Sequence, residues 1–341
     1  MFGSDNQAPA HPKVLEALLA ANDGRAASYG GDGWSEAAHR AVCEVFETDD
    51  LDLYLVGTGG AANGLGLGLI CPAWGAIACH HHAHILTDEG SGPEMFTQGA
   101  RLISAGCGPL LSPQDLEELA QRFPRTHVHS PQIRAVSVTN LSENGLTYGP
   151  EALGALAEVC KEQGWGLHMD GARFANALAH LGASPADLSW RSGIDVLSFG
   201  MTKNGAINAE ALIVFGRARH TSAAYLRKRA GQLFSKQRYL AAQFVAMLEG
   251  DLWLTLARHA NAMASQLADV LAQSGCAPIH PVEGNEVFVR LSDGQAQALN
   301  AAGVTFYPWR ALGPHAHRFV ASWQSTQAEV ETVARALAAA S

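Results

Sequence analysis

Short apolar runs alternate with helix-like segments between residues 51 and 216, and this alternation limits the fold more than any other feature. Helical spacing is clear in "SPQDLEELAQRF" at 112–123, which opens with a serine and a proline. These residues favour the first turn of a helix. The expected strands lie at 51–57, 75–79, 101–106, 133–140, 165–170, 193–200 and 211–216. Strands that alternate with helices predict an α/β fold, with a mostly parallel sheet covered on both faces.

The pattern changes after residue 218, where one long helical stretch is expected through 227–250 and another through 256–275. Short strands with brief helical pieces between them are expected at 286–291, 304–309 and 317–323. This predicts a large domain over residues 1–240 and a small α+β domain over residues 241–341. A ligand is expected in the crevice between the domains, at the carboxyl ends of the parallel strands.

The charge of the chain argues against some partners. Its formal net charge is −9, whereas binding to nucleic acid or to an anionic membrane requires a basic surface. The longest uncharged run, residues 64–79, contains Pro72 and several glycines and is too short to span a bilayer. The six cysteines show no CxxC spacing, and no signal-peptide pattern is present. Free buried thiols are typical of a reducing compartment, so we expect a cytoplasmic protein.

A glycine-rich turn follows the first expected strand, in "VGTGGAANG" at 56–64. Backbone N–H groups at such a turn, where a helix begins, favour the binding of a phosphate. A dinucleotide site would need an acidic residue about 20 positions further on. The next strand instead ends in Cys79 and His80, so a simple phosphate site is favoured. Close packing of the helix through these glycines is the structural alternative.

Two further strands end in ionisable residues. Asp170 closes the strand in "GLHMDGARFANA", where it either faces the crevice or caps the following helix. Lys203 follows the apolar strand in "IDVLSFGMTKNGA". A lysine that is desolvated there can form a Schiff base, whereas one in solvent is an ordinary loop residue. A phosphate site, a carboxylate and an amine at neighbouring strand ends are together what pyridoxal 5′-phosphate requires.

Six motifs carry a resemblance to a known family: "SDN" (4–6), "YGGDGW" (29–34), "TGGAAN" (58–63), "HAHILTDEGSGPEMF" (82–96), "HMDGARFANAL" (168–178) and "SFGMTKNG" (198–205). They are spread over the first 240 residues, and "HRFVASW" (317–323) extends the likeness towards the end. The chain resembles the low-specificity threonine aldolase and phenylserine aldolase group of fold-type-I pyridoxal phosphate enzymes. This resemblance implies an aspartate aminotransferase-like large domain and a small C-terminal domain.

The resemblance also implies which residues bind the cofactor. Lys203 would hold its aldehyde as a Schiff base, and Asp170 would pair with its pyridine nitrogen. Gly59, Gly60 and Ala61 would donate backbone N–H groups to its phosphate. The family often has a threonine at the position of Gly60, so one hydroxyl donor is missing in this chain.

Further residues are implied around the substrate and at a subunit boundary. Arg173 and Arg318 would surround the substrate carboxylate, and Arg173 would also lie beside the cofactor. Ser4 would help to hold the same carboxylate. Lys236 would reach the phosphate of a neighbouring subunit, with Tyr29 close to that boundary.

Four histidines lie together in "CHHHAHILTDEG" at 79–90. Taken alone, His82 and His84 with Asp88 or Asp170 are typical of a metal-dependent hydrolase. A metal-dependent hydrolase would not explain the glycine-rich turn or Lys203, so we expect no metal among the site residues.

The resemblance instead implies that His84 stacks on the cofactor ring and takes part in catalysis. His80 and His81 are then expected to be structural, and His82 to be a second proton-transfer partner. Some relatives carry a substrate-contacting histidine in the segment "TNLSENG" at 139–145, where this chain offers only Glu143. An imidazole titrates near neutral pH, so His84 is the favoured base.

The expected activity is a retro-aldol cleavage of L-β-hydroxy-α-amino acids to glycine and an aldehyde. The alternatives are an aminotransferase or another lyase on the same fold. The partner would be a small amino acid, and the resemblance implies a homotetramer built as a dimer of dimers. Which aldehyde is released, and which β-carbon configuration is accepted, the sequence leaves open.

Overall fold

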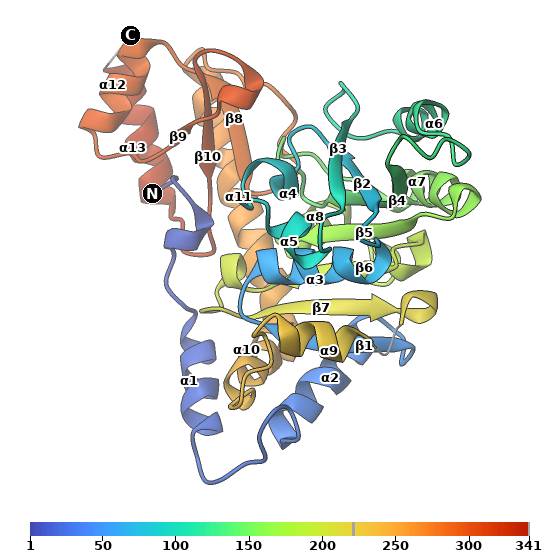
Figure 1. Cartoon of the computed structure of the whole chain (residues 1–341). Helices are drawn as coiled ribbons and strands as arrows, with labels where there is room; N and C mark the ends of the chain where they lie inside the picture. Colours follow the sequence, from blue (N-terminus) through green and yellow to red (C-terminus); the bar gives the residue numbers. More distant parts are fainter. Residues whose placement is uncertain (220–221, 340–341) are drawn as a thin grey trace.

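A seven-stranded sheet forms the centre of the computed structural model, which describes residues 1–219 and 222–339 (Figure 1). The strands follow one another in space as β1-β7-β6-β5-β4-β2-β3. Their bounds are β1 Leu51–Val56, β2 Gly75–His80, β3 Arg101–Ala105, β4 Gln132–Thr139, β5 Gly166–Gly171, β6 Val196–Gly200 and β7 Glu210–Phe215.

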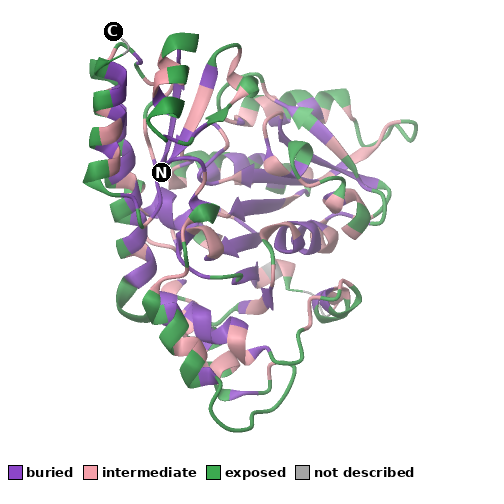
Figure 2. Ribbon diagram, turned by 90° about the vertical axis from the view of Figure 1, so that its left-hand side faces the viewer, coloured by how far each residue is buried: buried purple, intermediate pink, exposed green. Residues whose placement is uncertain are grey.

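Every strand of this sheet except β7 runs in the same direction. β3, β2, β4, β5 and β6 pair in parallel, and β7 is antiparallel to both β6 and β1. The central strands are buried on both faces, as their continuous apolar runs predict, and Figure 2 shows them buried. The predicted α/β fold with a mostly parallel sheet is confirmed.

Helices cover both faces of the sheet. α3 and α9 pack on one face, and α2, α7, α8, α10 and the start of α11 pack on the other. The helix bounds are α1 Pro12–Ala21, α2 Gly33–Val45, α3 Gly59–Ile70, α4 His84–Thr87, α5 Gly92–Phe96, α6 Pro113–Arg122, α7 Pro150–Gln163, α8 Phe174–Leu181, α9 Ser222–Arg229, α10 Arg238–Leu248 and α11 Leu252–Gln273.

The prediction of one long helix through 227–250 is wrong. The structure has α9 and α10 there, separated by an irregular segment, 230–237. Gly231 in this segment has a φ of 71°, in the left-handed region, which ends a helix at little cost. The helical spacing on either side hid this break.

A second, smaller core is built around a three-stranded antiparallel sheet in the order β8-β10-β9. Its elements are β8 Glu286–Arg290, α12 Asp293–Ala301, β9 Tyr307–Pro308, β10 Ala316–Val320 and α13 Gln327–Ala338. The amino-terminal segment joins this core, because the backbone of Phe2 bonds to Thr305 and Val320 and its ring is fully buried.

α11 belongs to both cores (Figure 1). Trp253 and Ala257 pack in the large core, whereas Met263 and Leu271 pack in the small one. α11 thus contributes one part of its length to each core. The stretch Arg238–Gln273 is long and apolar enough to cross a membrane, but 67% of its apolar window is buried inside the protein. Core helices meet the same criteria, so this is weak evidence for a membrane span.

Candidate active site

A cavity of about 550 Å³ lies at the carboxyl ends of the parallel strands and extends to the small domain. Nine residues named from the sequence line it together: Ser4, Gly59, Gly60, His84, Glu143, Asp170, Arg173, Lys203 and Arg318. They come from segments more than 300 positions apart in the chain. The parallel order of the large sheet brings its strand ends to one edge, as the sequence predicts, and the amino-terminal segment and β10 add Ser4 and Arg318.

One end of the cavity is formed by the first turn of α3. Thr58 is the N-cap of this helix, and its hydroxyl oxygen accepts a hydrogen bond from the N–H of Ala61 at 3.2 Å. The N–H groups of Gly59 and Gly60 precede the first helical bond and have no partner within the helix. Both glycines line the cavity, whereas Ala61 does not. Two free donors at a helix N-terminus make a site for an anion.

Asp170 lies at the end of β5 and is 4% exposed. Its Oδ2 accepts a hydrogen bond from Asn63 Nδ2 at 2.8 Å, and its Oδ1 accepts one from the N–H of Ala172. Burial alone would raise the pKa of Asp170, but the positive charges of His84 and Lys203 hold it below its ordinary value. Asp170 is therefore a carboxylate, and a cationic ring nitrogen is a suitable partner for it.

His84 begins α4 beside Asp170. Its Nδ1 lies 2.9 Å from Glu89 Oε1, which also accepts a hydrogen bond from Asn63. The bond to Glu89 raises the pKa of His84, and the charge of Asp170 acts in the same direction. The side chain of His84 is 44% exposed, so its ring remains accessible from the cavity. The contact of Nδ1 with Glu89 thus restrains the imidazole ring of His84.

Lys203 lies in the turn that follows β6, a short 3₁₀ helix over Thr202–Asn204. The turn is anchored by a hydrogen bond from Asn204 Nδ2 to the carbonyl of Trp253. Glu210 faces the same turn, and its Oε1 accepts a hydrogen bond from the N–H of Thr202. Burial raises the pKa of Glu210 to about 7. The positive charge of Lys203 acts against this shift of Glu210.

The other end of the cavity contains two arginines. Arg173 forms a bidentate pair with Asp5, at 2.7 and 3.0 Å, and lies 3.6 Å from Glu286. Burial opposes its charge, but Asp5 and Glu286 raise the pKa of Arg173 above its ordinary value. Arg318 lies 3.4 Å from Glu286 and has its guanidinium 4.3 Å from the ring centre of Trp309.

These two arginines differ in how far they are already paired. Arg173 already forms a bidentate pair with Asp5. Nε of Arg318, by contrast, is buried and has no hydrogen-bond partner among the described residues. Burial also lowers the pKa of Arg318, with Glu286 acting against the shift. A buried donor without a partner is costly unless a ligand satisfies it. Arg318 is therefore the arginine with capacity for a substrate carboxylate.

Glu143 follows β4 and lies between the two ends. Its Oε1 accepts hydrogen bonds from the N–H of His84 at 2.6 Å and from the hydroxyl of Thr139 at 2.9 Å. Burial raises the pKa of Glu143 to about 7, and the charge of Asp170 contributes. The carboxyl group therefore exchanges a proton near neutral pH.

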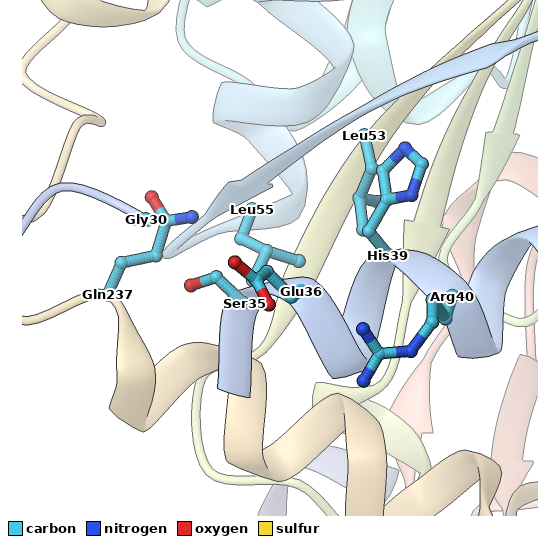
Figure 3. A pocket seen from close by; sticks show the side chains of 8 residues that line it. All are labelled: Gly30, Ser35, Glu36, His39, Arg40, Leu53, Leu55 and Gln237. Carbon is cyan, nitrogen blue, oxygen red and sulfur yellow. The ribbon is translucent and has the colours of Figure 1, made fainter. Parts of the chain in front are cut away.

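Tyr29 and Lys236 do not line this cavity. The N–H of Tyr29 bonds to the carbonyl of Ser235, and both Tyr29 and Lys236 are exposed. Their chain neighbours Gly30 and Gln237 line a separate hollow next to α2 (Figure 3). Within one chain, the structure does not bring these two residues to the other site residues.

The sequence missed several polar residues of the cavity. Thr58, Asn63 and Glu89 lay inside quoted motifs, and their place beside a glycine turn or a histidine was the available signal. Glu286 and Trp309 stood in expected strands, and Glu210 directly before one, and they gave no signal because ordinary strands also contain such residues. Their functional position depends on how the strands are arranged.

The comparisons with known proteins agree with this geometry. The sequence model of the beta-eliminating lyase family matches residues 2–294. The chain belongs to the beta-eliminating lyase family. It is 41% identical to the low specificity L-threonine aldolase of Pseudomonas aeruginosa, over 98% of this chain and 96% of that one. A Pseudomonas sp. protein of the same name is 40% identical, over 98% and 95%. The predicted likeness to this group of lyases is confirmed.

Two solved structures are similar to this chain in fold. The threonine aldolase of Leishmania major superposes with a TM-score of 0.91 and 27% identity, covering 99% of this chain and 98% of that one. Serine palmitoyltransferase of Sphingomonas wittichii superposes with a TM-score of 0.71 at 18% identity, over 99% and 86%. This second likeness concerns the fold alone.

Proposed function

We propose that the protein cleaves L-β-hydroxy-α-amino acids of the threonine, allo-threonine or phenylserine type to glycine and an aldehyde, with pyridoxal 5′-phosphate as cofactor. The observation that carries this proposal is the joint position of Lys203, Asp170, the α3 N-terminus and Arg318 around one cavity. An amine, a carboxylate, an anion site and a second anion site are the four contacts that this cofactor and an amino acid need. The 41% identity to a protein named as a threonine aldolase supports the same conclusion.

The residues present fit the cofactor. Asn63 Oδ1 and Glu89 Oε2 are buried beside the cavity without hydrogen-bond partners among the described residues. A Cβ atom on Gly60 would lie 3.6 Å from Glu89, so glycine keeps this wall open. Gly59 and Gly60 would hold the phosphate, Asp170 the ring nitrogen, and Lys203 the aldehyde, whereas the N–H of Ala61 is already bonded to Thr58. When bound, pyridoxal phosphate supplies a cationic ring that accepts the electron pair of the broken carbon–carbon bond.

Arg318 orients the substrate in this proposal. Its unsatisfied Nε and a terminal guanidinium nitrogen can bind a carboxylate in a planar, two-bond arrangement, with Ser4 lining the same cavity. Arg173 acts mainly through Asp5, by keeping the amino-terminal segment against the site. Fixing the carboxylate aligns the bond to be cleaved, and orientation supplies much of the catalytic effect.

The proton of the β-hydroxyl needs an acceptor, and we assign this to Glu143. Nδ1 of His84 faces Glu89, which holds the histidine ring beside Asp170 and leaves Nε2 of His84 as the second candidate acceptor. The Glu143 carboxyl lines the cavity next to His84 and has a pKa of about 7. A base is most effective when its pKa lies near the working pH. His84 remains in the proposal as the residue that lies against the ring and shapes the site.

The assembly and the compartment are parts of the same proposal. Lys236 and Tyr29 lie outside the cavity of their own chain, which supports a role across a subunit boundary, in a dimer of dimers. All six cysteines are free thiols, which supports a cytoplasmic location. Light scattering of the purified protein would measure the assembly, and a monomer would contradict it.

The experiment that tests the activity is a product assay. The purified protein with pyridoxal phosphate should release glycine and one equivalent of aldehyde from threonine, allo-threonine or phenylserine. If no glycine forms from any of the three, the proposal is wrong. Conversion of the bound cofactor to its amine form by an amino acid alone would indicate an aminotransferase. Activity lost to a chelator in a colourless protein would indicate a metal-dependent hydrolase.

A further inference from the structure

Three consecutive histidines lie outside the cavity, at the end of β2 and in the turn that follows it. The ring centres of His80 and His81 are 4.0 Å apart, and those of His81 and His82 are 3.9 Å apart. One ring nitrogen from each of the three lies within 4.8 Å of the other two. The proposed function makes no use of this cluster, and its close grouping calls for a separate account.

The tautomer of His82 follows from its neighbours. Asn144 Nδ2 donates a hydrogen bond to the carbonyl of Pro109 at 2.7 Å, which fixes the orientation of the amide. Asn144 Oδ1 then faces Nδ1 of His82 at 2.9 Å. Because an amide oxygen only accepts, Nδ1 of His82 must carry the proton. Nε2 of His82 therefore has a free lone pair.

His80 and His81 also present lone pairs. Nε2 of His80 lies 2.9 Å from the carbonyl of Gly108 and must carry the proton, which leaves Nδ1 as an acceptor. That Nδ1 accepts only the N–H of His82, at 3.2 Å. Nδ1 of His81 is buried and has no hydrogen-bond partner among the described residues. A buried polar atom that is left unsatisfied calls for a ligand.

We propose that His80, His81 and His82 bind a divalent transition metal ion of the zinc, nickel or copper class, at a site separate from the cofactor cavity. Imidazole nitrogen is a preferred ligand of these ions. Metal-binding histidines usually donate their other N–H to an oxygen, which fixes the ring. Gly108 and Asn144 already provide such oxygens for His80 and His82. Ligand distances of about 2.0–2.1 Å require the rings to turn inwards and the ion to replace the N–H of His82 at Nδ1 of His80, with water as a further ligand.

The protonation states agree with this geometry. The ring nitrogens that accept rather than donate follow from the oxygens facing His80 and His82, and a metal ion binds an imidazole through such a nitrogen. Asn144 is adjacent to Glu143, so a bound ion would also restrain the segment that carries the proposed base.

Titration calorimetry of the full chain, loaded with pyridoxal phosphate, tests the site with Zn²⁺ as the probe. We expect one saturable site per chain, and a visible spectrum of low coordination number when Co²⁺ replaces Zn²⁺. His81→Gln and His82→Gln should each weaken binding by about tenfold or more. His129→Gln is the matched control, because His127 and His129 form an exposed pair on another loop, and it should bind as the wild type does. Far-ultraviolet circular dichroism confirms that each variant is folded.

Three results would overturn the proposal. The first is the absence of saturable Zn²⁺ binding to the wild-type protein. The second is unchanged affinity in both His81→Gln and His82→Gln. The third is loss of binding in His84→Gln alone, which would place the ion at the group formed by His84, Glu89 and Asp170 in the cavity. None of these results depends on whether the protein cleaves a hydroxy amino acid.

Discussion

The two ends of the cavity are built in different ways. The cofactor end uses Gly59, Asp170 and Lys203, each of which directly follows or closes a strand of one parallel sheet. The substrate end uses Asp5, Arg173 and Arg318, which come from the amino-terminal segment, the large domain and the small domain.

The two ends of the cavity therefore differ in what holds their residues in position. At the cofactor end, the strands of one sheet and the turns that follow them position the contacts, so the placement of each residue depends on local backbone structure. At the substrate end, buried ion pairs between distant segments hold the arginines. Removing one partner of such a pair leaves an unpaired buried charge, which is strongly destabilising. The substrate end should therefore respond to changes in either domain.

The largest effect is expected at the cofactor end, from Lys203→Ala. Activity should fall by about 10⁴-fold or more, the range seen when a covalent nucleophile is removed. The visible absorbance of covalently bound cofactor should disappear as well. Lys161→Ala is the matched control, because this lysine is 67% exposed and makes only a surface pair with Glu158. Substantial activity in Lys203→Ala would contradict the assignment of this end of the cavity.

Glu143→Gln tests the residue that lies between the two ends. For the wild type, kcat/KM should rise as the pH increases through about 7, because the base must be ionised and burial raises its pKa to about 7. The variant should lose this limb of the profile and about 10²-fold or more in kcat. If Glu143→Gln keeps the wild-type pH profile, a group other than Glu143 acts as the base.

Arg318→Lys sharpens the contrast by changing only the substrate end. It keeps the charge but loses the planar pair of donors, so KM should rise by about tenfold or more, since a hydrogen bond to a charged group contributes about 1.5–3 kcal/mol. Affinity for the cofactor should stay the same. The exposed Arg219 pairs with Asp50 and Asp52, and Arg219→Lys should leave KM unchanged. Parallel losses of cofactor and substrate affinity in Arg318→Lys would show that the two ends are not independent.

The smallest effect is expected from Thr58→Ala at the N-cap of α3. Loss of the bond to the N–H of Ala61 should cost about 1 kcal/mol of stability and weaken cofactor binding several-fold, without a change in KM. Thermal unfolding with and without cofactor measures both. Thr58→Ser retains the hydroxyl and should resemble the wild type, so equal losses in Ala and Ser variants would exclude the capping explanation.

Most of the large domain could be predicted from the sequence, because the alternation of strands and helices is a local pattern. It also indicated Asp170 and Lys203, since an ionisable residue at the end of an apolar strand is unusual. The break between α9 and α10 was missed because Gly231 is a single residue between two segments of good helical spacing.

The partner of each ionisable group could not be predicted. Asp5 and Arg173 are 168 positions apart, and Glu286 meets two arginines only after the small domain has packed against the large one. The same holds for Asn144, whose contact with His82 crosses 62 positions. Pairings of this kind depend on tertiary geometry, which leaves no periodic pattern in the sequence.

The sharing of α11 between the two cores has a practical consequence for protein engineering. Recombining the small domain of this chain with the large domain of a relative would require a crossover point, and a loop before or after α11 is the obvious choice. Either choice gives one core a foreign helix surface, at Trp253 and Ala257 or at Met263 and Leu271. Functional chimeras are therefore expected only when both surfaces of this helix are redesigned together with their neighbours.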